Sequence, residues 1–228
     1  MLNLMKLELK KYKIRGSIKG GFIATFIIMA FIILLNYDKP DTPFASYEEV
    51  FGFSDTFVSL TFIIFASVLL CKYIIDEYKS GSITVLFMYP LQRKKLLAAK
   101  IIIVVLFTFI FGVIARVLIF TGFYLYNQYA HFIPGDPAAS LLMEQGVKTL
   151  VNSAVASCIS LVPLYFGMRK HSVPTTIVTA IIIGAILNSN NGSDFTLSSI
   201  FIIPATIGVI GLLIAYLSIR NVEVKDVM

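Results

Sequence analysis

The residues KIIIVVLFTFIFGVIARVLIFTGFYLY, Lys100 to Tyr126, form an apolar run with a single internal charge, Arg116. A helix needs about 20 predominantly apolar residues to cross the hydrocarbon core of a bilayer. This run is long enough, and the 228-residue chain shares its character, with 57% hydrophobic residues, 14% charged residues and a mean hydropathy of +0.86. The sequence therefore predicts an integral membrane protein.

Five further apolar runs flank this one and give six predicted spans. The spans cover residues 20–36, 57–75, 100–126, 147–168, 173–187 and 200–219. The first and fifth are short for a bilayer, so flanking side chains must snorkel or the bilayer must thin there. The expected fold is all-α, a bundle of six transmembrane helices that forms a single domain over residues 1–228.

The basic residues orient this bundle, because Lys and Arg accumulate on the cytoplasmic side of membrane spans. With the N-terminus inside, all nineteen basic residues except Lys39, Lys148 and Arg116 fall in cytoplasmic segments or at their edges. We therefore expect both termini in the cytoplasm. The net charge of +6 reflects topology rather than nucleic-acid binding, since a nucleic-acid binder carries its basic residues on a water-facing fold.

The cytoplasmic segment 76–99, between spans 2 and 3, is too short to cross the membrane and too apolar for a plain loop. Ser80 or Ser82 can cap a short helix there, and Pro90 ends it. The apolar face of this helix consists of Ile83, Leu86 and Phe87. So short a helix is unstable alone in water, and it either rests on lipid headgroups or docks into a groove of a cytoplasmic partner.

Three parts of this segment, DEYKSGSI (76–83), YPL (89–91) and RKKLL (93–97), resemble the first cytoplasmic loop of type 2 ABC exporter permeases. In that family the segment is a coupling helix, which inserts into a cleft of the ATPase subunit and moves when ATP closes the ATPase dimer. The resemblance implies that the ATPase docks on Glu77, Tyr78, Ser80, Gly81, Ile83, Leu86 and Phe87.

The same resemblance implies the partners of the chain. A second permease copy, identical or different, would complete the transport path, and residues 1–19 would form an elbow helix in the inner membrane interface. The chain has no G-x-x-x-x-G-K-[ST] motif, so ATP and Mg²⁺ are expected on the ATPase and no cofactor on this chain. Similar small exporters reside in bacterial cell membranes and handle peptides such as bacteriocins, antimicrobial peptides or phenol-soluble modulins.

Arg116 is the candidate for chemistry within the membrane. It lies about 24 Å along a helix from Lys100 and hence in the outer leaflet, where we expect it to snorkel to the headgroups. A role in lining a cavity, or a pair with Asp55 or Glu144, is the alternative. Small polar residues such as Asn152 in the fourth span are expected to serve helix packing. The residues predicted to line a substrate path are Phe26, Phe57, Phe62 and Arg116.

Other function classes fit less well. His131 and His171 are predicted on opposite sides of the membrane, so they form neither a metal site nor a catalytic dyad, and an enzyme is not expected. A self-powered secondary transporter would need intramembrane acids or an inverted repeat, and the sequence shows neither. A non-transporting immunity or scaffold protein stays a third possibility.

Overall fold

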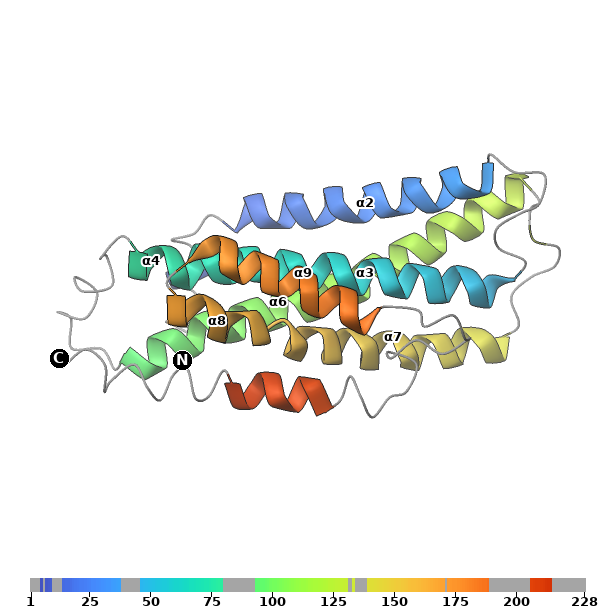
Figure 1. The fold of residues 1–228 in the computed structure, drawn as a ribbon. Coiled ribbons are helices and arrows are strands. Elements are labelled where there is room, and N and C mark those ends of the chain that lie inside the picture. Colours follow the sequence, from blue (N-terminus) through green and yellow to red (C-terminus); the bar gives the residue numbers. More distant parts are fainter. Residues whose placement is uncertain are drawn as a thin grey trace.

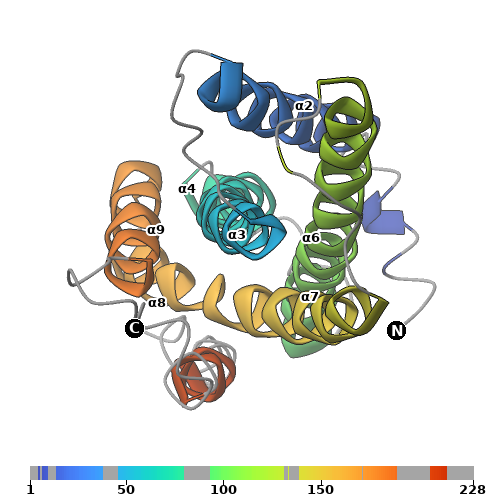
Figure 2. The same cartoon turned by 90° about the vertical axis from the view of Figure 1, so that its right-hand side faces the viewer.

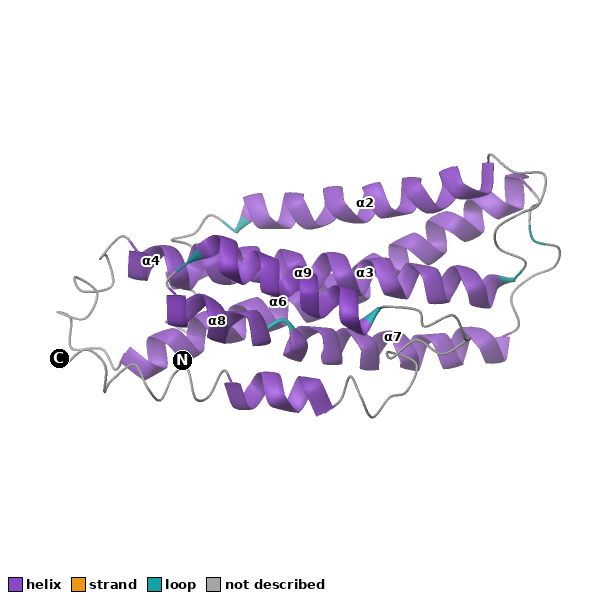
Figure 3. Cartoon of the chain, viewed as in Figure 1, coloured by secondary structure: helices purple, strands orange, loops and turns teal. Residues whose placement is uncertain are grey.

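The computed structural model describes residues 5, 7–9, 14–37, 46–79, 93–130, 133, 139–170, 172–188 and 206–214, and these residues are helical almost throughout (Figure 1 and Figure 3). The elements are α2 (Arg15–Tyr37), α3 (Tyr47–Leu70), the π-helical turn η1 (Cys71–Ile75), α4 (Asp76–Lys79), α6 (Arg93–Ala130), α7 (Ala139–Ile159), α8 (Val162–Lys170) and α9 (Val173–Leu187). Residues 206–214 form a further helical segment. The prediction of an all-α fold is confirmed.

Four helical stretches in the described part are long and apolar enough to cross a membrane. They are Arg15–Leu35, Tyr47–Lys79, Lys95–Tyr129 and Leu141–Lys170. The apolar helix α9 has the bounds predicted for the fifth span, but its 15 residues are fewer than such a crossing needs. The number of six spans and their orientation stay predictions. We call the end of the bundle where α4 stops and α6 starts the inner end, and the opposite end the outer end (Figure 1).

The helix that contains the second span begins at Tyr47, ten residues before the predicted start at Phe57. Ser46 has an extended backbone, and its hydroxyl accepts a hydrogen bond from the backbone N–H of Glu49 at 3.4 Å. Glu48 and Glu49 also place negative charge in the first turn, which favours a helix N-terminus. The stretch 37–56 between the first two predicted spans is therefore partly helical.

α2 and α6 also extend beyond the predicted spans. α2 begins at Arg15, so Arg15 to Lys19 continue the long helix instead of belonging to the predicted elbow. α6 has 38 residues, which at 1.5 Å per residue is about 57 Å, far more than a bilayer core. Helix α6 thus projects past the predicted span at both ends.

The predicted fourth span is interrupted between α7 and α8. Pro163 has no N–H to donate to the carbonyl of Ile159, so the regular ladder cannot continue through this point. The N–H of Leu161 instead bonds the carbonyl of Cys158 at 3.2 Å, a tighter turn than in an α-helix. The helix is therefore broken next to this proline.

The helical segment 206–214 lies very close to α7. A Cβ atom built on Gly211 would stand 2.4 Å from the carbonyl oxygen of Cys158, which no real side chain tolerates. Glycine lets two helix backbones approach in lipid, where dispersion contacts drive association. This contact fixes part of the predicted sixth span against the fourth.

Helix α3 is the centre of the bundle (Figure 2). It contacts α2, α6, α7, α8 and α9. In its most apolar window 61% of the residues are buried inside the protein, against 22% for α2. Its innermost residues repeat every fourth position, at Val58, Phe62, Ala66 and Leu70. Because α3 touches all these neighbours, any displacement of α3 must be accommodated by the whole bundle.

Aromatic side chains join α3 to α6 along much of their length. Phe51 stacks on Phe120 with 4.7 Å between ring centroids, and Phe65 stacks on Phe107 at 5.8 Å. Phe107 in turn stacks on Phe111 at 4.3 Å. Such pairs contribute about 0.5–1.5 kcal/mol each beyond area burial, so α3 and α6 form a well-connected helix pair.

A buried asparagine closes the outer end of this pair. Asn127 of α6 donates from Nδ2 to the Tyr47 hydroxyl at 2.8 Å and to the Ile133 carbonyl at 3.0 Å. Its Oδ1 accepts from the N–H of Ile133 at 2.9 Å. The first residue of α3 and the chain after α6 are therefore held by one side chain.

Candidate functional site

Arg116 lies in a polar network between three helices in the outer half of the bundle. Its side chain is buried, at 5% exposure for the residue. Nε donates to Asp55 of α3, Nη2 to the Ser59 hydroxyl at 2.8 Å, and Nη1 to the Ser153 hydroxyl of α7 at 3.0 Å. One guanidinium thus connects α3, α6 and α7.

The carboxylate of Asp55 completes this network. Its second oxygen accepts from Gln145 Nε2 at 3.3 Å and from Asn152 Nδ2 at 3.4 Å, both on α7. The charge of Arg116 is therefore neutralised and hydrogen-bonded inside the protein, as a buried ion pair requires. The expectation that Arg116 snorkels to the headgroups is wrong, and the alternative of a pair with Asp55 is correct.

Arg116 can pair with Asp55 because of the length of α3. Because α3 starts at Tyr47, Asp55 lies two turns inside a helix and points toward α6 instead of standing in a loop. Asn152, which was expected to serve helix packing, donates a hydrogen bond to Asp55, and the neighbouring Ser153 accepts one from Arg116. Gly112 contributes its carbonyl oxygen to Arg116 Nη1 at 3.3 Å.

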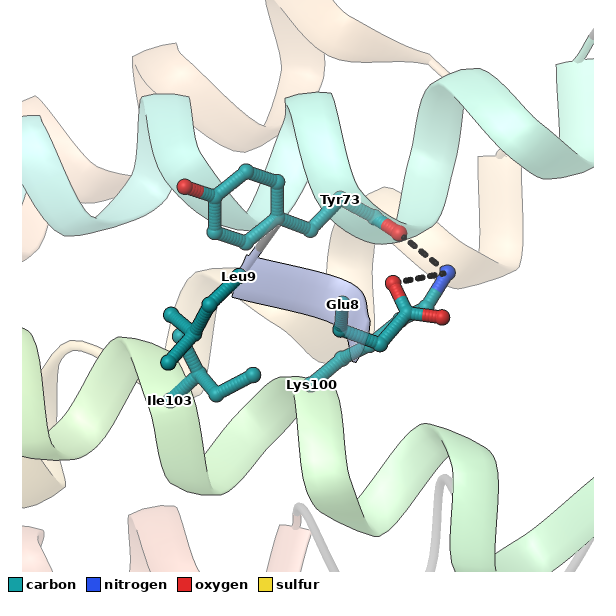
Figure 4. Close-up of a pocket in the computed structure, with 5 residues that line it drawn as sticks. All are labelled: Glu8, Leu9, Tyr73, Lys100 and Ile103. Atoms are coloured by element: carbon teal, nitrogen blue, oxygen red, sulfur yellow. Dashed lines mark hydrogen bonds and ion pairs between the residues drawn. The ribbon is translucent and has the colours of Figure 1, made fainter. Parts of the chain in front are cut away.

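A second buried ionic cluster lies at the inner end (Figure 4). Lys100 of α6 is 1% exposed, and its ammonium donates to the carbonyl of Tyr73 in η1 at 2.9 Å. It also pairs with the carboxylate of Glu77 in α4 and lies 3.8 Å from Oε2 of Glu8. Leu9 and Ile103 cover the cluster on its apolar side.

This inner cluster was not among the sites predicted from the sequence. Its signal was nevertheless present, because Glu77 follows the second predicted span and Lys100 begins the third, so two opposite charges stand at the ends of one short segment. Glu8 is the only acidic residue in the basic stretch before Gly20. Two side chains that bracket a segment joining antiparallel helices are natural partners, although their burial was not evident.

The predicted docking residues fall partly inside the described structure. Glu77 is buried in the cluster with Lys100, and Tyr78 is half-buried against the core. Ser80, Gly81, Ile83, Leu86 and Phe87 lie outside the described residues. The helices extend into both ends of the predicted coupling segment, with α4 ending at Lys79 and α6 beginning at Arg93. The docking role of these residues stays a prediction.

The four residues predicted to line a substrate path occupy different environments. Phe26 is 56% exposed on α2, whereas Phe62 is 2% exposed in the core of α3. Phe57 packs on Phe31 with ring centroids 5.6 Å apart. Arg116 lies in the polar network. The structure does not bring these side chains together, and their role in transport stays a prediction.

No group of three His, Cys, Asp or Glu side chains in the described ranges is placed to hold a metal ion. Instead, buried ion pairs connect the helices at two levels of the bundle. α6 supplies the cation at both levels, Lys100 at the inner end and Arg116 toward the outer end, and α3 with its extension η1 and α4 supplies acceptors at both. These ion pairs hold the helices of the bundle together.

The chain is similar in sequence to known proteins. The uncharacterized protein YcbO of Bacillus subtilis (strain 168) is 42% identical over 228 residues, which cover 99% of this chain and 100% of that protein. No solved structure matches the chain. Residues 4–188 match the family described as ABC-2 family transporter protein. Since that match covers most of the helices described above, this multi-pass membrane protein belongs to the ABC-2 family of transporter proteins.

Proposed function

We propose that this chain is the transmembrane permease subunit of an ATP-driven exporter, and that an ABC ATPase docks on residues 80–92 at the inner end. Family membership supports the first part, because ABC-2 membrane proteins are typically non-catalytic subunits that generally pair with an ABC ATPase. ATP and Mg²⁺ belong to that partner in this proposal. The membrane is the bacterial cell membrane.

The single observation that carries the docking proposal is the placement of this segment between two long helices. The helical stretch before it is Tyr47–Lys79, which comprises α3, η1 and α4, and the helix after it is α6. These two helices are joined by stacked aromatic rings and by the pair of Arg116 with Asp55. A partner that pushes on residues 80–92 therefore acts on a helix pair whose members are held together.

Movement of this pair reorganises the bundle in the proposed mechanism. α3 contacts α2, α7, α8 and α9, so its displacement changes each of those interfaces. Packed helices exchange between discrete arrangements because close-packed interiors do not deform continuously. Closure of the ATPase thus switches the permease between inward-open and outward-open or closed states.

The proposed substrate is an amphipathic or hydrophobic peptide. The charges of Arg116 and Asp55 satisfy each other in the described structure, and so leave the pair with little capacity to bind a small ion. Exposed apolar side chains cover α2, including Ile23, Phe26 and Ile27. Such a surface suits lipid, a second permease copy or an apolar substrate. A second copy, in a homodimer or a heterodimer, completes the path.

The docking proposal is tested with charge on one face of the predicted short helix. Leu86→Asp with Phe87→Asp is compared with Val85→Asp with Met88→Asp, which places the same charge on the opposite face at 100° per residue. Each variant is co-expressed with the ABC ATPase encoded nearest to its gene. We expect the first pair to lose ATPase pull-down with unchanged thermal stability, and the second to retain it.

Transport then separates this proposal from its rivals. A fluorescent amphipathic peptide is added outside inverted membrane vesicles, and its uptake is measured with and without ATP and the ATPase. Uptake that requires both supports an ATP-driven exporter. Uptake driven by an ion gradient alone would identify a secondary transporter, and binding without uptake an immunity or scaffold protein. Retained pull-down by the Leu86→Asp, Phe87→Asp variant contradicts the docking site.

A further inference from the structure

The ammonium group of Lys100 connects three parts of the chain that are distant in sequence. It reaches the backbone of η1 through the Tyr73 carbonyl and the N-terminal segment through Glu8 (Figure 4). It also reaches α4 through Glu77. Glu8 and Glu77 are each 7% exposed and Lys100 is 1% exposed. One buried cation therefore has two buried carboxylates near it.

These two carboxylates are bound unequally. Glu77 is in direct hydrogen-bonding contact with the ammonium, whereas Glu8 Oε2 is 3.8 Å away, beyond a normal hydrogen bond. Glu8 Oε2 is buried and has no hydrogen-bond partner in the described part of the chain. A buried carboxylate oxygen in that state is costly. The site therefore holds a second acceptor that is only partly used in this arrangement.

The better-bound carboxylate lies where the proposed ATPase acts. Glu77 stands three positions before residue 80, in the four-residue helix α4, and η1 precedes it directly. A π-helical turn inserts an extra residue into a helix and is frequent at functional sites. A push on residues 80–92 reaches Glu77 before it reaches the core of α3.

We infer that Lys100 is a positioning residue that links the N-terminal segment to the coupling segment, its ammonium passing from Glu77 toward Glu8 when the ATPase displaces α4. This inference rests on the proposed function. It explains why Glu8 is buried beside a cation that it does not fully engage. It also gives the N-terminal segment a role in the ATP-driven movement, because the strengthened ion pair of Lys100 with Glu8 holds that segment to α6.

The variant that tests this exchange is Glu8→Gln. It removes the charge of the second acceptor while the Glu77 pair with Lys100 stays intact, so folding is preserved. Its control is Glu144→Gln, the same chemical change in an exposed pair with Lys148 at 2.7 Å on α7. Lys100→Arg, which keeps the cation, is the conservative variant expected to retain coupling.

Two measurements report on the link in the complex with its ATPase. The first is the number of substrate molecules transported per ATP hydrolysed, which we expect Glu8→Gln to lower at least about fivefold, the lower end of typical coupling between sites. The second is cross-linking of Leu9→Cys to Ile103→Cys by a short bismaleimide, with Cys71 and Cys158 replaced by Ala. ATP should change the cross-linking yield with Glu8 present and leave it unchanged in Glu8→Gln.

The outcomes distinguish this inference from the function on which it rests. Loss of coupling in Glu8→Gln, with ATPase pull-down and thermal stability like those of Glu144→Gln, supports it. Coupling and an ATP response of the cross-link that equal those of Glu144→Gln overturn the inference and leave the proposed function standing. Failure of the unmodified chain to bind the ATPase or to transport with ATP overturns both.

Discussion

Replacing Arg116 by Leu should destabilise the bundle strongly. The change leaves the Asp55 carboxylate buried without its cation. It also removes the N–H groups that donate hydrogen bonds to the hydroxyls of Ser59 and Ser153. Breaking a buried pair from one side costs about 3–5 kcal/mol, because an uncompensated charge is left in a low-dielectric site.

The structure places the expected loss near the lower end of that range. The Asp55 side chain is 18% exposed, and its carboxylate keeps the amide donors of Gln145 and Asn152. Ser59 and Ser153 can turn their hydroxyls to helix carbonyls of the preceding turn. We therefore expect a loss of about 3 kcal/mol. For a chain of this length that is a fall in Tm of about 6–12 °C.

The measurement is thermal unfolding of the purified protein in detergent, followed by size-exclusion chromatography. The matched control is Lys148→Leu, which removes a cation from an exposed pair with Glu144. Such pairs contribute about 0.3–0.5 kcal/mol, so this variant should have nearly the parent Tm. Adding Asp55→Asn to Arg116→Leu should recover part of the loss, because it removes the stranded charge.

Two results would refute the reasoning. A fall in Tm for Arg116→Leu no larger than that of Lys148→Leu would mean that the pair with Asp55 contributes nothing. A double variant less stable than Arg116→Leu alone would mean that the stranded carboxylate is not the source of the loss.

Two further changes probe how the helices are held. Gly211→Ala should destabilise the protein by about 1–3 kcal/mol, since the added methyl group would meet the Cys158 carbonyl. Gly52→Ala, with open space around it, should stabilise it by up to about 1 kcal/mol through helix propensity. Equal Tm values for the two variants would contradict the close approach at Gly211. Asn127→Ala should cost about 2–3 kcal/mol, because about 1 kcal/mol is lost for each of three hydrogen bonds, while Gln128→Ala on the exposed side should cost little. Limited proteolysis of the chain after α6 provides a second readout, and equal cleavage of these two variants would rule out the proposed clamp.

Much of the candidate site depends on features that hydropathy does not record. The early start of α3 is encoded locally, since Ser46 and Glu49 have the spacing of a capping box, but the pattern of apolar residues does not show it. That omission put Asp55 in a loop and led to the wrong expectation for Arg116. Asp55 had been named as an alternative partner of Arg116, but the sequence did not show the direction in which the Asp55 side chain points.

The inner cluster was missed for a different reason. Glu77 and Lys100 are 23 residues apart, and each is unremarkable at the end of a predicted span. A charge at such a position usually reaches water, so nothing local reveals that α4, α6 and the N-terminal segment enclose both. The resemblance to the family was confirmed for the chain as a whole, and it drew attention to the predicted apolar face of the segment between them instead of to its charged ends.

The sequence by itself determined that this chain is a helical membrane protein of the ABC-2 family and where most of its long helices lie. Those properties follow from hydropathy and helix signals within short windows of residues, and from similarity along most of the chain. Only the tertiary structure decided that Arg116 joins α3 to α7 and that Lys100 stands between two carboxylates. Pairing of this kind depends on how helices rotate and cross, and that is set by contacts among residues far apart in the chain.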